Sequence, residues 1–339
     1  MMDLHCCETT ENEITACDDK TLHHERVLEN MIKNEDRYVP MYSSSANIQT
    51  EITDPMIMIV GEWMMEVCEE QKCQDDVFLL AMNYMYRFLK TTNIKKNQLQ
   101  LLGAACMFLA SKLREPKPLP ADTLVFYTDH SITKNMLMKW ELLVLSKLKW
   151  DVVAIVPVDF LPHLLMRLNL ERFEIRREMV KKHAKILITL CAKGKSAAVG
   201  LDGLDGRGPE TKRTVALKVP GTVDCSQPNQ CRFTSYHPSL IACACIVSAL
   251  CGLGWVNKYQ QTLDGLLRRL AELIAVETEI MRVLVTQIDE MIKENFNDVK
   301  DNKNVCEEVT RSEQCTPPPG KIRDHKTANT PTDVHDIYF

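Results

Sequence analysis

Glycine is scarce in this sequence. It accounts for 12 of 339 residues, about 3.5%, against a usual level of about 7%. Glycine supplies many tight turns of β-rich folds and the phosphate-binding loops of many enzymes, so its scarcity argues against both. Six of the 12 glycines lie between residues 193 and 230, and the rest of the chain is poorer still. We therefore expect a helical body interrupted by one unusual segment.

An excess of positive charge is also lacking. The 41 Lys and Arg residues are outnumbered by 46 Asp and Glu, which gives a net charge of −5 at pH 7. Binding to phosphate backbones needs clustered cations, so we expect no nucleic-acid partner. The longest apolar run, 240–255, is shorter than the about 20 residues of a membrane span, and the first residues form no signal peptide. We expect no membrane partner, and an intracellular protein whose 14 cysteines are mostly reduced.

What the sequence does contain is helical periodicity, which predicts an all-α fold with two consecutive groups of five helices. Asp54 is expected to cap the first helix, with Ile59, Met64 and Val67 forming its apolar set. The third helix is apolar nearly all round and should be buried. The expected helices begin with a short one over 21–34. The first group then runs from 54 through 75–90, 97–114, 120–128 and 132–148, and the second covers 157–168, 172–192, 237–253, 259–273 and 275–294.

Three patterns that could indicate catalysis or metal binding are incomplete. Residues 194–196 resemble the end of a phosphate-binding loop, but the first glycine of that motif is missing. The glycines of 200–206 have the wrong spacing for a dinucleotide loop. Cys225, Cys231 and His237 could meet around zinc, but they lack paired CxxC spacing. We expect no enzyme activity, no cofactor and no metal.

The N-terminus carries a short motif of the form L-x-C-x-E. In an extended strand, Leu4, Cys6 and Glu8 would point to the same side. Such a segment can present an apolar, a small and an acidic side chain to a groove on another protein. Its place in a polar terminus favours an accessible docking peptide.

Several segments of the helical region closely resemble D-type cyclins. The similarity covers about 1–192, resumes at about 231–294 and returns in the tail. The segments that carry it are 62–73, 80–84, 87–89, 99–104, 110–112 and 147–150.

This resemblance implies two cyclin boxes without catalytic activity. It implies a regulatory subunit that binds and activates a cyclin-dependent kinase of the four/six type, directs it to retinoblastoma-family proteins and promotes entry into DNA synthesis. Kinase inhibitor proteins, and a ubiquitin ligase acting through the C-terminal tail, are further implied partners. The implied location is the nucleus and the cytoplasm. The alternative is a cyclin-fold transcription scaffold that activates no kinase.

The resemblance also assigns site residues. Lys112 and Glu141 would lie at the kinase interface, although solvated charges at helix ends are the simpler interpretation. The Leu4-Cys6-Glu8 strand would be the retinoblastoma-docking motif. Together these five residues favour the kinase subunit over the scaffold.

One face of the first helix carries Met56, Val60 and Trp63, at positions i, i+4 and i+7. Core packing would explain this spacing. The resemblance instead implies an apolar groove for short substrate and inhibitor peptides, with Glu66 at its acidic side.

The sequence departs from the family at a charged pair. Family members usually carry Arg and Asp where this chain has Ile57 and Tyr86. Because both partners are replaced, no single buried charge remains, and we expect the first box to fold.

The resemblance and the composition together predict four regions. A phosphodegron is expected at Thr330, and Thr316 is a weaker proline-directed candidate. The regions are a flexible tail over 1–20 with the docking motif, a first box with its N-terminal helix over 21–152, a second box over 153–294, and a disordered tail over 295–339.

The second box is interrupted by residues 193–230, which show no helical period. Such long irregular segments are uncommon inside compact domains. Two explanations stay open, a functional insertion loop and a retained intron, and the second is favoured because the ends of the segment can be encoded by splice-site-like codons. Sequencing transcripts across codons 192–231 separates them.

Overall fold

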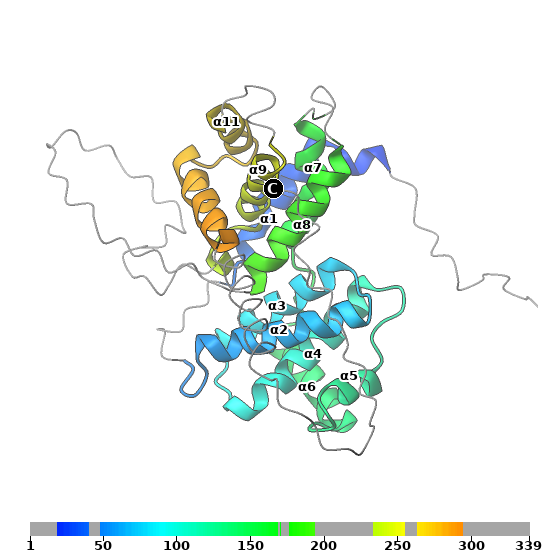
Figure 1. Ribbon diagram of the computed structural model, residues 1–339. Helices are drawn as coiled ribbons and strands as arrows, with labels where there is room; N and C mark the ends of the chain where they lie inside the picture. Colours follow the sequence, from blue (N-terminus) through cyan, green and yellow to red (C-terminus); the bar gives the residue numbers. More distant parts are fainter. Residues whose placement is uncertain are drawn as a thin grey trace, which may run out of the picture.

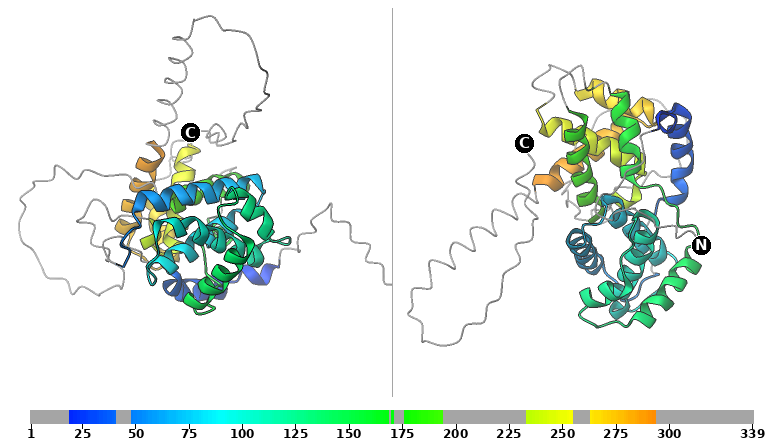
Figure 2. Two further views of the ribbon diagram at one scale, coloured as in Figure 1. Left: turned by 90° about the horizontal axis from the view of Figure 1, so that it is seen from below. Right: turned by 90° about the vertical axis from the view of Figure 1, so that its right-hand side faces the viewer.

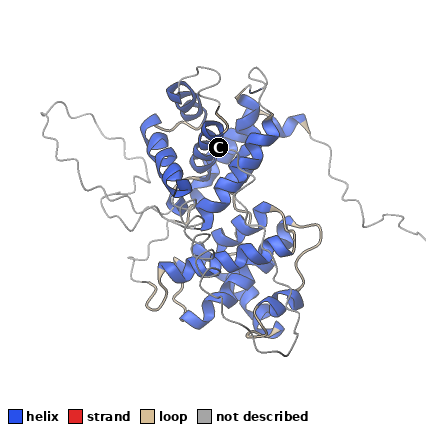
Figure 3. Cartoon of the chain, in the orientation of Figure 1, coloured by secondary structure: helices blue, strands red, loops and turns tan. Residues whose placement is uncertain are grey.

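The computed structural model describes residues 19–40, 48–168, 170, 176–193, 233–254 and 263–293. Within these ranges the chain forms α-helices and short 3-10 helices, with no strand (Figure 3). The helices form two groups that follow one another along the chain (Figure 1). The predicted all-α fold is confirmed for this part of the chain.

The first group contains the five predicted helices: the first begins at the predicted residue, and each of the other four lies within two residues of its expected bounds. They are α2 (Asp54–Glu70), α3 (Asp75–Leu89), α4 (Leu99–Arg114), α5 (Ala121–Tyr127) and α6 (Lys134–Lys147). Thr53, rather than Asp54, is the N-cap of α2, and Pro55 occupies the first turn. Apart from the half-buried Gln100, α4 is buried from Leu99 to Ser111, as its sequence predicts.

One expected inward residue of α2 is wrong. Met64 and Val67 are buried, but Ile59 is 67% exposed. At 100° per residue, five positions separate Ile59 from Met64 by about 140° around the helix, so the two side chains point to different faces. Ile57 occupies the buried side instead.

The second group is built around a charge-free helix. Its helices are α7 (Pro157–Arg167), α8 (Arg177–Lys193), α9 (Pro238–Gly252), α11 (Leu263–Leu273) and a helix over 278–293. α8 begins later than predicted. All of α9 from Pro238 to Leu250 is buried. Burial raises the pKa of the Cys243 thiol in α9 and of Cys106 in α4, which therefore pack as small apolar residues.

The N-terminal helix α1 (Glu25–Glu35) packs on the second group (Figure 2, right). Its last residue, Glu35, is buried at the start of α9. The Glu35 carboxylate accepts hydrogen bonds from Ser239 N at 2.8 Å and from Ser239 Oγ at 2.6 Å. A carboxylate at a helix N-terminus satisfies free N–H groups and interacts favourably with the helix dipole. α1 therefore caps a helix more than two hundred residues further along the chain.

Ion pairs also join the two groups. Arg114, at the end of α4, binds Asp159 of α7 at 3.1 Å and Asp76 of α3 at 3.2 Å. Two pairs reach from α8 to the first group, Lys185 to Asp75 at 2.7 Å and Lys193 to Glu62 at 2.7 Å.

Several helices end in a left-handed residue without using glycine. Lys72, Asp129, Lys149 and Ala275 have φ between 51° and 55° and follow the C-caps of their helices. At the end of α6, Lys149 N donates to Ser146 O and Trp150 N donates to Leu145 O, the pairing of a Schellman motif. Low glycine content thus did not exclude these turns, although an L-residue is strained there by about 1 kcal/mol or more.

Gly103 is the glycine that a close helix approach requires. A Cβ at this position of α4 would lie 3.0 Å from Val60 Cγ1 and 3.1 Å from Met64 Sδ of α2. Helices α2 and α4 therefore approach each other closely at Gly103.

Candidate protein-binding surfaces

The structure brings Lys112 and Glu141 together. Lys112 Nζ at the end of α4 donates to Glu141 Oε1 of α6 at 2.5 Å. The Lys112 ammonium also lies 3.8 Å from the centre of the Phe108 ring, one turn earlier on α4. Because the Lys112 side chain is 39% exposed and that of Glu141 is 14% exposed, the pair is held at the surface rather than freely solvated.

Large apolar side chains flank this ion pair. Leu113 is 47% exposed and Leu142 is 61% exposed, and each directly follows one member of the pair. An ordered charge pair next to exposed leucines is typical of a protein interface, where apolar contact gives affinity and charge gives specificity. The C-terminal end of α4 and the middle of α6 thus form one candidate binding face, which we call the α4–α6 face.

A second candidate surface lies on α2. Met56, Val60 and Trp63 are half-buried and pack on the core, whereas Glu66 is exposed. The Trp63 indole N–H donates to the carbonyl of Tyr127 at 3.2 Å, which fixes the ring against the end of α5. Trp63 is therefore less free than an exposed tryptophan. The packing of Met56, Val60 and Trp63 on the core agrees with the simpler interpretation of this spacing, and the peptide groove stays a prediction.

Ile57 and Tyr86 are both buried, with 0% and 1% of their surface exposed. Ile57 comes from α2 and Tyr86 from α3. Burial at both positions agrees with the expectation that these residues replace an internal charged pair.

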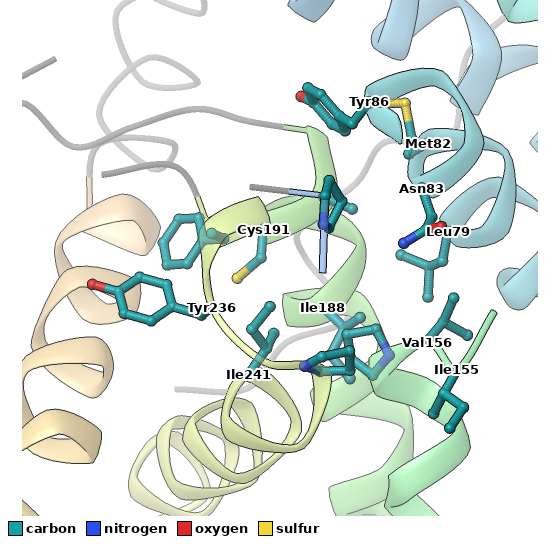
Figure 4. Close-up of a pocket in the computed structure, with 15 residues that line it drawn as sticks. Leu79, Met82, Asn83, Tyr86, Ile155, Val156, Ile188, Cys191, Tyr236 and Ile241 are labelled. Atoms are coloured by element: carbon teal, nitrogen blue, oxygen red, sulfur yellow. The ribbon is translucent and has the colours of Figure 1, made fainter. Parts of the chain in front are cut away.

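An apolar cleft separates the two helical groups (Figure 4). Leu79, Met82 and Tyr86 of α3 face Ile188 of α8 and Ile241 of α9 across it. The connection between the groups lines the same cleft with Ile155, Val156 and Pro157. These side chains let the second group pack on the first without a shared helix.

Three expected sites fall outside the described residues. They are the Leu4-Cys6-Glu8 motif, the phosphorylation sites Thr316 and Thr330, and all of the 193–230 segment except Lys193. Cys225 and Cys231 also lie outside, and the third candidate zinc ligand, His237, pairs with Asp36 at 3.1 Å. Among the residues that are described, no cluster of three or more potential metal ligands occurs and no helix is long and apolar enough to cross a membrane.

Sequence reasoning missed one surface, a groove rich in cations. Arg37, Arg87, Lys90, Lys147 and Lys149 line it. The signal was weak because these residues come from three separate stretches of the chain, and an overall net charge of −5 conceals a local excess.

Comparison with known proteins agrees with this architecture. A model of the cyclin N-terminal domain matches residues 26–153. A viral cyclin of herpesvirus saimiri has the same fold, with a TM-score of 0.58, 22% identity, and coverage of 79% of this chain and 97% of the viral one. The fold is that of a cyclin, a class of regulatory rather than catalytic proteins.

Relatives that match over nearly the whole chain show to which family of cyclins it belongs. The chain is 36% identical to G1/S-specific cyclin-D2 of Gallus gallus over 338 residues, which cover 99% of both chains. It is also 36% identical to G1/S-specific cyclin-D3 of Homo sapiens over 340 residues, with both chains covered completely. The chain belongs to the G1/S-specific D-type cyclin family, and its role in the cell cycle is regulatory.

Proposed function

We propose that this chain binds and activates a cyclin-dependent kinase of the four/six type and directs it to retinoblastoma-family proteins. The observation that carries the proposal is the Lys112–Glu141 pair, held at 2.5 Å between α4 and α6 and flanked by exposed leucines. Kinase partnership agrees with membership of the D-type cyclin family.

Activation requires no catalytic group on the cyclin. A kinase is active when its own Lys–Glu pair and metal-binding residues are assembled. A partner that binds this conformation more tightly than the inactive one shifts the population towards it. The α4–α6 face would provide that preference through apolar contact with the kinase, while Lys112 and Glu141 fix the orientation.

A charge swap tests this proposal. Lys112→Glu should abolish most kinase activation, because it places two carboxylates together and reverses the charge offered to the kinase. The double variant Lys112→Glu/Glu141→Lys restores an ion pair within the cyclin but exchanges its ends. If both residues contact the kinase, the swap should recover thermal stability without recovering activation of the kinase on a retinoblastoma-protein fragment.

Lys117→Glu is the matched control, since Lys117 is exposed and the charge change is the same. Equal activation by wild type and Lys112→Glu, or recovery of activation by the swap, would contradict a kinase contact. No activation by wild type would favour a cyclin-fold transcription scaffold.

The remaining parts of the proposal concern recruitment and turnover. Leu4, Cys6 and Glu8 would dock retinoblastoma-family proteins, and the α2 stripe with Glu66 would bind substrate and inhibitor peptides. Phosphorylation of Thr330 would recruit a ubiquitin ligase or promote nuclear export, so the chain would occupy both nucleus and cytoplasm. Deleting residues 1–8 should reduce phosphorylation of the retinoblastoma fragment while leaving a short peptide substrate unaffected.

A further inference from the structure

A groove with excess positive charge lies at the C-terminal ends of α3 and α6. Its walls are the stretch that follows α1, the end of α3, and the turn after α6. The groove has a volume of about 430 Å³, within the range of about 300–1,000 Å³ usual for ligand sites. It lies apart from the residues assigned to the kinase contact and to the α2 stripe.

The balance of charge in this groove is uneven. Asp151 is the carboxylate that lines it, against the five cations Arg37, Arg87, Lys90, Lys147 and Lys149. Asp151 is already shared, because its Oδ2 lies 2.7 Å from Arg37 Nε and 3.7 Å from Arg87 Nη2, and its Oδ1 accepts from Tyr38 Oη at 3.3 Å. Asp151 therefore neutralises only part of this charge.

The three lysines have no such partner. No carboxylate of the described residues lies within ion-pair distance of Lys90, Lys147 or Lys149, and all three are exposed. Lys90 and Lys147 stand at helix C-termini, where a cation interacts favourably with about half a negative charge. These partial charges offset part of the lysine charge, and a net positive groove remains on a chain whose net charge is −5.

Arg87 provides a second, independent observation. Its side chain is 13% exposed and its guanidinium lies 5.5 Å from the centre of the Tyr38 ring, so its position is fixed. Its Nη1 is buried and has no hydrogen-bond partner among the described residues. Burial lowers the pKa of Arg87, which an additional anion nearby would counteract. Arg87 thus keeps one unused donor although it shares Asp151, and three unpaired lysines line the same groove.

The backbone holds Lys149 at the edge of this groove. Lys149 and Trp150 both have positive φ, 55° and 59°, in the hydrogen-bonded turn that ends α6. The turn leaves Trp150 68% exposed. A peptide that places an anion in the groove would have an aromatic side chain within reach.

We propose that this groove binds a phosphate monoester carried by a phosphorylated peptide. A phosphoseryl group concentrates about two negative charges and three acceptor oxygens in one place, which suits several converging cations better than a single carboxylate does. The choice of a phosphopeptide rests on the proposed function, since a kinase subunit meets its own phosphorylated products. Binding itself does not depend on the kinase.

The test uses the full-length chain without kinase. A fluorescent ten-residue peptide with one phosphoserine in a neutral sequence is titrated, and its anisotropy gives the dissociation constant. Lys90→Gln/Lys147→Gln should weaken binding at least tenfold. Lys95→Gln/Lys96→Gln is the matched control, because these two exposed lysines lie outside the groove and the charge change is equal. The control variant should bind as the wild type does.

Competition and substitution identify the ligand. Inorganic phosphate should displace the peptide at higher concentration, which would show that the phosphate is recognised, and the peptide should bind more tightly than phosphate alone. Equal binding of the peptide with Glu in place of phosphoserine, or of a duplex RNA, would overturn the proposal. So would equal weakening by the control variant.

A parallel kinase assay separates this proposal from the proposed function. If Lys90→Gln/Lys147→Gln loses kinase activation but still binds the peptide as the wild type does, the groove belongs to the kinase interface and the phosphopeptide proposal is wrong. If wild type binds the phosphopeptide but activates no kinase, the proposed function fails while the groove stands.

Discussion

α4 and α9 are the most deeply buried helices of their groups, but they differ in charge. α9 contains no charged residue, and the carboxylate at its start comes from Glu35 of α1. α4 is apolar over most of its length and then ends in Lys112 and Arg114. In the first group, the buried helix α4 therefore ends at a charged surface. In the second group, the central helix α9 brings no charge of its own to the surface.

The charged end of α4 has two separate roles, a candidate contact with a partner and a connection between the two groups. Lys112 faces Glu141 on the α4–α6 face, while Arg114, two residues later, ties that same helix end to α3 and α7. The candidate contact residue Lys112 thus lies next to Arg114, whose ion pairs connect the two groups. The four substitutions below test whether charge and strain act in each group as this comparison requires.

The largest effect is expected inside the first group. Ile57→Arg places an unpaired charge in a fully buried position and should lower the free energy of unfolding by about 3–5 kcal/mol. Ile59→Arg is the control on the same helix, because Ile59 is 67% exposed and its substitution should change stability by less than about 0.5 kcal/mol. Urea unfolding measures both.

Adding Tyr86→Asp to Ile57→Arg supplies the missing partner. If the two positions replace an internal charged pair, the double variant should be more stable than Ile57→Arg by at least about 1 kcal/mol. A double variant no more stable than the single one would show that the positions are not coupled.

The second largest effect is expected at Arg114, whose ion pairs connect the two groups. Arg114→Ala removes the cation between Asp76 and Asp159, and should cost about 2 kcal/mol because both carboxylates remain mostly covered. Burial already raises the pKa of Asp76 despite the nearby Arg114. Thermal unfolding followed by calorimetry should show a lower midpoint. An unchanged midpoint would mean that the cleft residues and the two ion pairs from α8 hold the groups together without Arg114.

A smaller effect is expected where α1 meets the second group. Glu35→Gln keeps the shape but loses one of two accepted hydrogen bonds, which should cost about 1 kcal/mol near neutral pH. Burial is the main cause that raises the pKa of Glu35 above 4.5, and the bonds from Ser239 and the charge of His237 oppose it.

The raised pKa of Glu35 gives this substitution a pH signature. The folded chain binds the proton more tightly than the unfolded chain, so this group's contribution to stability falls as the pH rises from 4.5 through the raised pKa. Glu35→Gln has no such group, so its stability deficit relative to wild type should be larger near pH 4.5 and should shrink as the pH rises to 7. A constant difference between the two proteins from pH 4.5 to 7 would contradict a raised pKa.

The smallest effect concerns strained helix ends. Ala275→Gly should raise stability by about 0.5–1 kcal/mol, because φ of 54° is strained for alanine and not for glycine. Gly254→Ala is the reciprocal control, since Gly254 has φ of 71° and open space around it. It should lose about 1 kcal/mol. Equal effects of the two substitutions would remove backbone strain as the cause.

Much of the fold could be predicted from the sequence, as the helices of the first group show. Apolar spacing located α3 to α6 within two residues, and the apolar run in α4 predicted its burial. Ile59 was misplaced because a loose helical spacing accepts residues about 140° apart. Thr53 took the place of Asp54 as N-cap, since several polar residues near Pro55 could start the helix.

The sites were less accessible to sequence reasoning. Lys112 and Glu141 were singled out only through family resemblance, because nothing local to either residue indicates a partner 29 positions away. The cation-rich groove was missed for the same reason. The attachment of α1 to α9 through Glu35 also had no sequence signal.

The sequence by itself determined the helices, the apolar interior and the family, because side chains that recur every 3.6 residues define a buried face from local information. Tertiary structure alone decided which charges meet. Glu35 reaches Ser239, Arg37 reaches Asp151 and Arg114 reaches Asp159 only after the helices have packed. Distances between such groups depend on the crossing of whole helices, a property that no short stretch of sequence contains.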